Sequence, residues 1–303
     1  MATFPIHRIA VIGTGTVGAS WSALFLAHGL TVLAWDPAPG AATRLREHLR
    51  QTLPILRELG LKGEGELQMA TTPEAAAQTA DFVQENAPET VDLKVSLLGR
   101  LDAASPPQTL IASSTSALRL SEINSACQHH PERVIVAHPF NPPHLIPLVE
   151  LTGAPVARQR AAAFYRQIGK YPVCLQREMT GHIANRLSSA LWREALYLLQ
   201  EGVASVADID AALSQGPGLR WAFLGQFMIY HLGGGEGGIG HHLEHLGESQ
   251  LRRWASLGEP RWDENLKQRI REGVAAASDR DIAELAAERD RKLLQLLALK
   301  DKA

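Results

Sequence analysis

The tightest constraint on the fold is a glycine-rich hexapeptide near the start of the chain, Gly13-Thr14-Gly15-Thr16-Val17-Gly18. It follows a short β-branched run, Arg8 to Ile12, and precedes a helical stretch that ends at Gly29. A G-x-G-x-x-G loop in this position allows a tight turn, lets the backbone approach a diphosphate, and brings helix and strand close together. The free N–H groups at the start of the helix favour an anion at the same place. The sequence therefore predicts a dinucleotide-binding unit, with all six loop residues in the cofactor site.

The second strand-like run, Leu30 to Asp36, ends on an acidic residue about 20 residues after the loop. A carboxylate at this point accepts hydrogen bonds from both hydroxyls of the adenosine ribose and repels a 2′-phosphate. The segment from Pro37 to Pro39 offers no arginine to bind such a phosphate. Asp36 therefore predicts NAD rather than NADP as the cofactor. The alternative is a glycine turn that binds no ligand.

Strand-like and helical segments alternate through the first part of the chain, and this pattern is typical of a mostly parallel sheet covered by helices on both faces. From about Thr180 onward the apolar residues recur with helical spacing and no strand-like run returns. We therefore expect an α/β chain, with a Rossmann-type doubly wound, mostly parallel sheet followed by an all-helical C-terminal domain. A length of 303 residues fits two domains, here an NAD-binding domain over 1–180 and a helical substrate and dimerisation domain over 181–303. Four further strands are expected at Asp81 to Val83, Thr109 to Ala112, Val134 to Ala137 and Leu148 to Leu151.

Charge and composition exclude several classes of partner. The formal net charge is -2, and no run of Lys or Arg could neutralise several phosphates, so we expect no nucleic-acid partner. No apolar run approaches the roughly 20 residues of a membrane span, and the chain does not open on an export signal. The two cysteines, Cys127 and Cys174, form neither a disulfide framework nor a metal-binding spacing. These features indicate a cytoplasmic protein.

An imidazole and a carboxylate come together in the strands that follow. His138 lies in the segment Ala137-His138-Pro139-Phe140-Asn141-Pro142 after the fifth strand, and Glu150 lies in the next strand. Oxidation of an alcohol by hydride transfer needs a base with a pKa near neutrality, and a carboxylate on the second ring nitrogen fixes the tautomer of that base. His138 and Glu150 fit these roles, although His138 alone would also fit a buried structural histidine.

These motifs together resemble the L-3-hydroxyacyl-CoA dehydrogenase superfamily, and the resemblance spans nearly the whole chain. It rests on the glycine loop, Ser114-Thr115-Ser116, the His138 segment with Glu150, and Gly181-His182-Ile183-Ala184-Asn185-Arg186. The resemblance implies that Ser116 hydrogen-bonds the reacting oxygen and that Asn185 helps to hold the substrate. It also implies, on a looser match, that Glu89 and Lys94 face the cofactor or substrate cleft. From the residues alone, Ser116 can equally cap a helix and Asn185 can bond a neighbouring turn.

One segment departs from the acyl-CoA enzymes. Gly216-Pro217-Gly218-Leu219-Arg220-Trp221-Ala222-Phe223 resembles the branch that contains L-carnitine and L-gulonate 3-dehydrogenases and lens λ-crystallin, and this branch implies a small free 3-hydroxy acid as the substrate. A buried Arg220 would bind a carboxylate, and an interhelical salt bridge is the alternative. Phe140, Trp221 and Phe223 are candidate aromatic partners for a substrate cation, with core packing as the alternative.

Two rival functions remain open at this point. A short-chain L-3-hydroxyacyl-CoA dehydrogenase would use the same four catalytic positions, and a crystallin-like protein would keep the NAD-binding fold without turnover. The family implies a homodimer, and the stripe that contains Trp192, Leu196 and Leu199 would pack either against a second subunit or inside its own domain. His241, His242 and His245 are the other histidine cluster. No ligand motif completes it, so we expect no metal.

Overall fold

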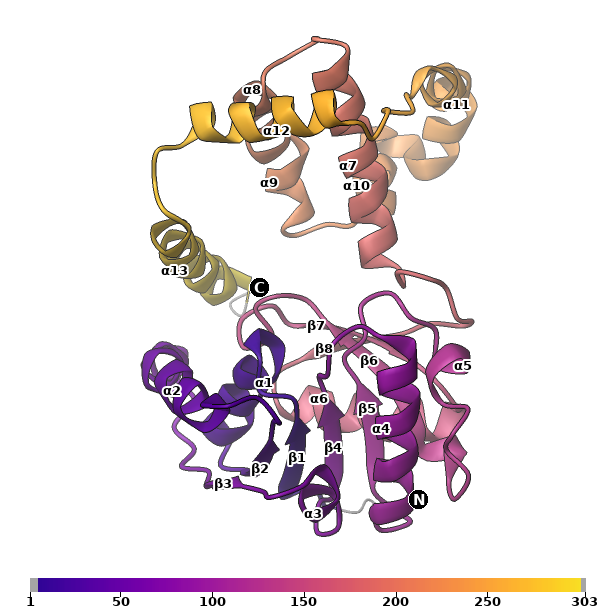
Figure 1. The fold of residues 1–303 in the computed structure, drawn as a ribbon. Coiled ribbons are helices and arrows are strands. Elements are labelled where there is room, and N and C mark those ends of the chain that lie inside the picture. Colours follow the sequence, from indigo (N-terminus) through magenta and orange to yellow (C-terminus); the bar gives the residue numbers. More distant parts are fainter. Residues whose placement is uncertain (1–4, 301–303) are drawn as a thin grey trace. The chain divides into compact units, whose positions relative to one another are not determined.

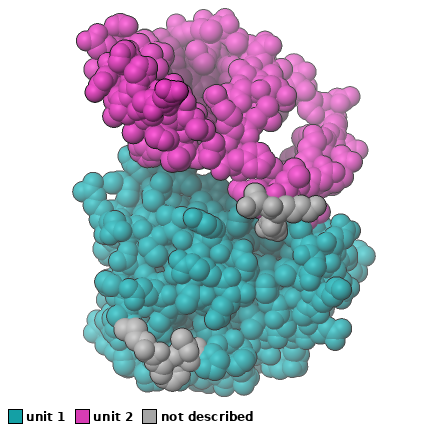
Figure 2. Space-filling model, turned by 180° about the vertical axis from the view of Figure 1, so that it is seen from behind, with its two compact units in different colours: residues 1–186 teal, residues 187–303 magenta. Residues whose placement is uncertain are grey.

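The computed structural model describes residues 5–300 of the chain. The chain divides into two compact units, unit 1 with residues 1–186 and unit 2 with residues 187–303 (Figure 2). The expectation about an export signal falls partly on residues 1–4, which lie outside the described residues. Within the described part, no helix is long and apolar enough to cross a bilayer.

Unit 1 is built on an eight-stranded sheet with the strand order β3-β2-β1-β4-β5-β6-β7-β8 (Figure 1). The order reverses between β1 and β4, and a nucleotide in a doubly wound fold binds at such a reversal. All neighbouring strands are parallel except β6 and β7. The strands are β1 (Arg8–Ile12), β2 (Thr31–Trp35), β3 (Leu67–Met69), β4 (Phe82–Glu85), β5 (Leu110–Ser113), β6 (Val134–Pro139), β7 (Leu148–Thr152) and β8 (Tyr171–Cys174).

Two layers of helices cover the sheet, because the central strands are apolar on both sides. Along β1, Ile9 and Val11 pack in one apolar core, whereas Ala10 and Ile12 pack in the other. The first core takes side chains from α1 (Thr16–Ala27), α2 (Ala41–Glu58) and α6 (Pro155–Gln167). The second takes them from α3 (Pro73–Ala77), α4 (Val91–Ala104) and α5 (Leu120–Ile123).

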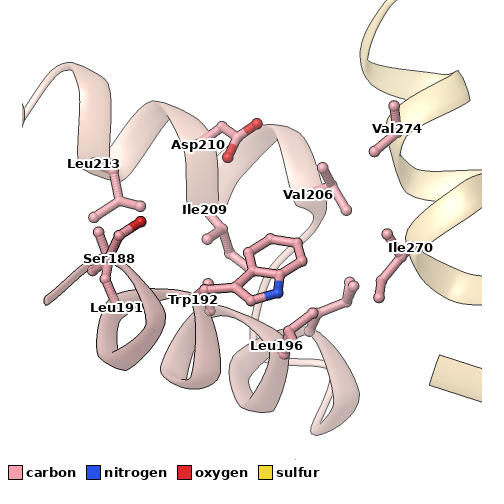
Figure 3. A pocket seen from close by; sticks show the side chains of 12 residues that line it. Ser188, Leu191, Trp192, Leu196, Val206, Ile209, Asp210, Leu213, Ile270 and Val274 are labelled. Atoms are coloured by element: carbon pink, nitrogen blue, oxygen red, sulfur yellow. The ribbon is translucent and has the colours of Figure 1, made fainter. Parts of the chain in front are cut away.

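Unit 2 contains only helices among its described residues. Leu196 and Leu199 of α7 pack with Leu266 of α12 in its small core. Next to this core, α7, α8 and α12 line an apolar cavity of about 210 Å³, and Figure 3 shows Trp192 among the side chains of its wall. The helices are α7 (Ala184–Gln200), α8 (Val206–Ser214), α9 (Pro217–Trp221), α10 (Gln226–Gly233), α11 (Gly238–Ser256), α12 (Glu264–Ala277) and α13 (Ile282–Lys300).

The predicted fold class is confirmed, with a Rossmann-type sheet followed by helices. The sequence did not predict β3 and β8, since both are short and carry no clear alternation. Between α10 and α11, residues Gly235–Gly237 form one turn of 3-10 helix. Of the stripe on α7, Leu196 and Leu199 are buried inside unit 2, whereas Trp192 is 53% exposed.

Candidate active site

The glycine loop lies between β1 and α1, and the space that an added Cβ would find differs from one glycine to the next. Gly13 has a φ of +86°, and a Cβ there would come within 2.7 Å of the Asn86 carbonyl oxygen. A Cβ on Gly18 would lie 1.9 Å from the Gly13 carbonyl oxygen. A Cβ on Gly15 would meet nothing within 4 Å. Gly13 and Gly18 are therefore required by the fold itself, and Gly15 borders open space at the uncapped start of α1.

Asp36, directly after β2, is tied to this loop. Its Oδ2 accepts hydrogen bonds from the Thr14 amide at 2.7 Å and from the Thr14 hydroxyl at 3.2 Å, and its Oδ1 accepts one from the Ala38 amide at 2.9 Å. A carboxylate has about four lone-pair sites, so these three bonds leave acceptor capacity for a ribose hydroxyl. The side chain is only half-buried, which leaves it within reach of a ligand.

Glu89 holds the Ser/Thr turn that follows β5. Its Oε1 accepts hydrogen bonds from the Thr115 hydroxyl at 2.6 Å, the Ser116 amide at 2.8 Å and the Ala117 amide at 3.0 Å. Burial alone would raise the pKa of Glu89, but these bonds and the nearby charge of Lys94 hold that pKa below its ordinary value. Glu89 is therefore ionised at neutral pH and fixes the backbone that carries Ser116.

Lys94 is buried, in contrast to the expectation that it faces a cleft. Its ammonium donates to the Glu85 carboxylate at 2.8 and 3.1 Å and to the Ala87 carbonyl at 3.0 Å, and it lies 3.7 Å from Glu89. An ammonium has three donors, and these partners account for all of them. In this structure Lys94 contacts the segment that positions Glu89, and its side chain is only 1% exposed.

His138 and Glu150 form a buried pair across the antiparallel strands β6 and β7. The strand register places the two residues directly opposite each other, and His138 Nδ1 lies 2.9 Å from Glu150 Oε2. A carboxylate can only accept a hydrogen bond, so Nδ1 carries the proton and Nε2 is left as the basic nitrogen. The pair therefore has the arrangement required of an oriented general base.

The second oxygen of Glu150 binds the start of α7. Glu150 Oε1 accepts hydrogen bonds from the Ile183 amide at 2.8 Å and the Ala184 amide at 3.0 Å. Burial would raise the pKa of this carboxyl, but the bonds from His138 and from the two amides hold it below its ordinary value. Both oxygens are thus in use, and the carboxylate stays ionised at neutral pH.

The segment from Gly181 to Asn185 donates hydrogen bonds to the turns that carry the site residues. The Asn185 amide group donates to the Ser116 carbonyl at 3.0 Å, and His182 Nε2 lies 3.2 Å from the Thr115 carbonyl oxygen. His182 has a φ of +50°, and its ring centroid lies 5.0 Å from that of His138. Burial lowers the pKa of His182, and the neighbouring His138 lowers it further by a smaller amount. This second imidazole is therefore neutral at neutral pH.

Phe140 packs edge-on against His138, with ring centroids 5.3 Å apart. It is half-buried and lies at the start of the connection between β6 and β7. Every site residue that the sequence predicted in unit 1 thus belongs to one of two groups. The glycine loop and Asp36 lie at the reversal of strand order. The other group is joined by adjoining contacts and consists of Glu89, Lys94, Ser116, His138, Phe140, Glu150 and Asn185.

Arg220, Trp221 and Phe223 belong to unit 2, at the end of α9 and just beyond it. The expectation of a buried Arg220 is wrong, because its side chain is exposed, and it forms no ion pair with any residue in the range 5–300. α9 is a short surface helix without a buried residue, which explains this exposure. Trp221 and Phe223 are 40% and 56% exposed. The alternative of an interhelical salt bridge for Arg220 is therefore not supported.

The histidines of α11 pack with rings rather than with carboxylates. The rings of His241 and His245 stack with centroids 4.1 Å apart, and His242 stacks on Tyr230 at 4.5 Å. Across the described residues, no group of three His, Cys, Asp or Glu side chains is arranged to hold a metal ion.

Sequence reasoning assigned no role to His182, although the motif that contains it was identified. Its contact with His138 depends on a left-handed backbone, which for a residue other than glycine has no reliable signal in one sequence. Glu85 was missed as well. It is buried and accepts hydrogen bonds from Lys94 and from the Ser113 hydroxyl, and a glutamate at the end of an apolar strand was the available signal.

Two family models match the chain. Residues 8–179 match the NAD-binding domain of 3-hydroxyacyl-CoA dehydrogenase, and residues 181–274 match the C-terminal domain of the same enzyme. Among similar proteins, the L-carnitine dehydrogenase of Streptomyces griseus is 48% identical over 96% of this chain and 89% of its own length. The L-carnitine dehydrogenase of Oceanobacillus iheyensis is 39% identical over 97% of this chain and 98% of its own length.

Solved structures agree with these matches. The crystal structure of 5-formyl-3-hydroxy-2-methylpyridine 4-carboxylic acid 5-dehydrogenase, an NAD+-dependent dismutase, superposes with a TM-score of 0.84 at 29% identity and covers 97% of this chain and 98% of its own. 3-Hydroxybutyryl-CoA dehydrogenase from Escherichia coli gives a TM-score of 0.63 at 32% identity, over 76% of this chain and 50% of that one. NAD is the cofactor of this family, and the open space at Gly15 fits its diphosphate.

Gly15 and Gly18 make a matched test of the loop, because an added Cβ meets open space at the first and a backbone oxygen at the second. Gly15→Ala should leave the melting temperature within about 2 °C of the wild type and weaken NAD binding about tenfold or more, because the new methyl group occupies only open space at the anion site. Gly18→Ala should destabilise the fold by about 1–3 kcal/mol, because its Cβ meets a backbone oxygen. Thermal unfolding and NADH fluorescence titration measure both effects. Equal NAD affinity in Gly15→Ala and the wild type would remove the loop from the cofactor site.

Proposed function

Because the chain belongs to the 3-hydroxyacyl-CoA dehydrogenase family, we propose that it oxidises the 3-hydroxyl of a small free hydroxy acid, and that this acid is L-carnitine. Membership makes the protein an NAD-dependent oxidoreductase. The observation that carries the proposed reaction is the buried His138–Glu150 pair, with Nε2 of His138 left as a base. The proposed substrate is supported by L-carnitine dehydrogenases that match over nearly the whole chain.

We propose that His138 Nε2 takes the hydroxyl proton while the C–H bond breaks. Alcohol oxidation releases a proton, so a base at the oxygen lowers the barrier. The imidazole becomes positively charged in this step, and the Glu150 carboxylate 2.9 Å from Nδ1 stabilises that charge. The same bond keeps the ring in one orientation, since its Nδ1 proton has a fixed acceptor. NAD, when bound, supplies the hydride acceptor.

Ser116 and Asn185 are proposed to position the substrate oxygen. The Ser116 hydroxyl lies 3.3 Å from Glu89, a long hydrogen bond that leaves it free to turn toward a substrate. Its backbone is fixed from two sides, by the Glu89 carboxylate on its amide and by Asn185 on its carbonyl. Lys94 supports Glu89 from the buried side at 3.7 Å. In this proposal Glu89 acts through the Ser116 turn as well as toward the cofactor, and Lys94 acts through Glu89.

The cofactor is proposed to lie across the strand reversal between β1 and β4. The loop Gly13 to Gly18 and the uncapped start of α1 would hold its diphosphate. Asp36 would hold the adenosine ribose and exclude a 2′-phosphate. Glu89 and His138 stand after β4 and at the end of β6, at the same edge of the sheet, where the nicotinamide end of a bound dinucleotide would reach them.

L-Carnitine carries a carboxylate and a trimethylammonium group, so its site requires an anion partner and a partner for a cation that forms no strong hydrogen bond. An exposed, unpaired guanidinium suits the first role, and Arg220 is the residue we propose for it. Aromatic faces suit the second role. Phe140, next to His138, and Trp221 and Phe223 in unit 2 are the proposed aromatic residues.

His138→Ala should retain NADH binding and lose about 10²- to 10⁴-fold in kcat, the usual effect of removing a general base. Glu150→Gln should move the acidic limb of the kcat/KM profile to lower pH, because the protonated imidazole loses the negative charge that stabilises it. Initial rates of NADH formation between pH 5 and 10, with NADH fluorescence as the binding control, measure both effects. Near-normal turnover of His138→Ala would end the proposed mechanism, and an unshifted profile for Glu150→Gln would make Glu150 purely structural.

Steady-state NADH formation with L-carnitine, L-gulonate and L-3-hydroxybutyryl-CoA identifies the substrate. We expect L-carnitine to give the highest kcat/KM, and Arg220→Gln to raise its KM about tenfold while kcat changes less, since a carboxylate clamp contributes mainly to binding. Phe140→Leu should also raise the KM for L-carnitine through the lost aromatic face. A higher kcat/KM for the CoA ester would establish the acyl-CoA rival, and no turnover of any of the three would favour the crystallin-like alternative.

We also propose that the protein is a homodimer whose subunits meet through unit 2. Most of its exposed large apolar side chains belong to this unit, and soluble monomers seldom leave so many uncovered. A second copy is the partner that the family resemblance implies. The exposed large apolar side chains of α10 and α11 are Phe227, Met228, Leu232, Ile239, Leu243, Leu246, Leu251 and Trp254.

Replacing both Leu243 and Trp254 with glutamate should convert a dimer into a monomer. These side chains are 63% and 58% exposed and share one face of α11, so buried charges would oppose association at this surface. Light scattering should show a fall from twice the 32.9 kDa chain mass to the single mass. Val156→Glu, on the exposed side of α6, serves as the control and should stay dimeric. A dimer that survives the double substitution would exclude α11 from the interface.

We propose a cytoplasmic location on the chemistry of the two cysteines. Cys127 is buried, Cys174 is exposed, and both are free thiols. Exported proteins usually pair their cysteines, whereas thiols persist in the reducing cytoplasm. Burial raises the pKa of Cys127 to about 11, so this thiol is protonated and unreactive at neutral pH.

A further inference from the structure

The connection between β6 and β7, residues 140–147, joins the two members of the His138–Glu150 pair. Its backbone is fixed from one side by a buried lysine. Lys170 precedes β8, is 6% exposed, and donates hydrogen bonds to the carbonyl oxygens of Pro143 and Ile146, the latter at 2.7 Å. Both acceptors belong to the connection, so the lysine spans it from within.

The other side of the connection is bound to helix α1. The Ser20 hydroxyl accepts a hydrogen bond from the His144 amide at 2.9 Å and lies 2.7 Å from Nδ1 of the same histidine. The ring of Trp21, the next residue on α1, lies under the Lys170 ammonium at 5.1 Å. α1 is the helix that begins at the glycine loop. These contacts tie α1 to the connection. We call Ser20, Trp21 and Lys170 the loop clamp.

The burial of Lys170 costs free energy, which indicates that this side chain does more than fill space. Burial lowers the pKa of Lys170 to about 7, so folding works against its charge. An apolar side chain of similar length would fill this place without that cost. A neutral lysine amine still has two N–H donors, so the bonds to Pro143 and Ile146 persist in either protonation state.

We propose that the loop clamp positions His138 relative to α1, the helix that begins at the glycine loop. Its three members act through the 140–147 backbone, which leaves His138 at one end and reaches Glu150 at the other. The inference rests on the proposed dehydrogenase function. A base displaced by a fraction of an ångström from the line of proton transfer loses rate steeply, so the clamp should govern kcat rather than cofactor affinity.

The test uses Ser20→Ala and Lys170→Met in the full-length protein, with Ser105→Ala as the matched control. Ser105 is also a buried serine next to a helix, and its hydroxyl donates a hydrogen bond to the Leu101 carbonyl oxygen of α4 instead of contacting the connection. Each clamp variant should lower kcat about 10- to 100-fold, with NADH affinity within about twofold of the wild type. Neither variant should slow His138→Ala any further, because the clamp acts through His138. Wild-type kcat in both variants, or an undiminished additional loss in the His138→Ala background, would overturn the proposal.

Hydrogen exchange measured by mass spectrometry gives a second readout that needs no turnover. Amides in the 140–147 peptide should exchange about tenfold faster in Ser20→Ala and Lys170→Met, and at the wild-type rate in Ser105→Ala. If the wild type oxidises none of the three test substrates while this exchange rises, the proposed function fails and the clamp stands. Unchanged exchange in both clamp variants would overturn the clamp, whatever the substrate. Ser20→Ala removes only one oxygen atom, so it decides the matter even if Lys170→Met does not fold.

Discussion

The carboxylate of Glu150 is the group on which the rest of the site depends. One oxygen binds Nδ1 of His138 and the other binds the first amides of α7. The residue is 1% exposed, and a buried carboxylate without partners would take up a proton. Three donors keep it charged instead. The compensated negative charge of Glu150 therefore determines the tautomer of His138, the start of α7 and the placement of Asn185 beside Ser116.

Much of unit 1 could be predicted because its signals are local. The glycine loop, the aspartate that follows β2 and the histidine segment at the end of β6 are each recognisable from a few residues of sequence. Topology then gathers them, since the carboxyl ends of parallel strands lie at one edge of a sheet. His138 and Glu150 needed one further fact, the antiparallel pairing of β6 with β7, which the sequence alone did not specify.

The remainder could not be predicted because its partners are distant in sequence or depend on exposure. Lys170 reaches the carbonyl groups of Pro143 and Ile146, and Lys94 turns inward to Glu85. A lysine in either place carries no sign of burial in its own neighbourhood. Arg220 gives the opposite error, because the proposed carboxylate contact assumed a buried side chain and the short helix α9 leaves the residue at the surface. Side-chain environment, more than secondary structure, was the limit of sequence reasoning.

His182 combines an unfavourable backbone conformation with favourable contacts of its side chain. A side chain in the left-handed region costs about 1–2 kcal/mol relative to glycine, and here the cost is offset by the contacts of the imidazole with Thr115 and His138. A glycine would relax the turn and give up those contacts. At this position a relaxed backbone and close contacts to His138 therefore exclude each other, and the histidine keeps the contacts.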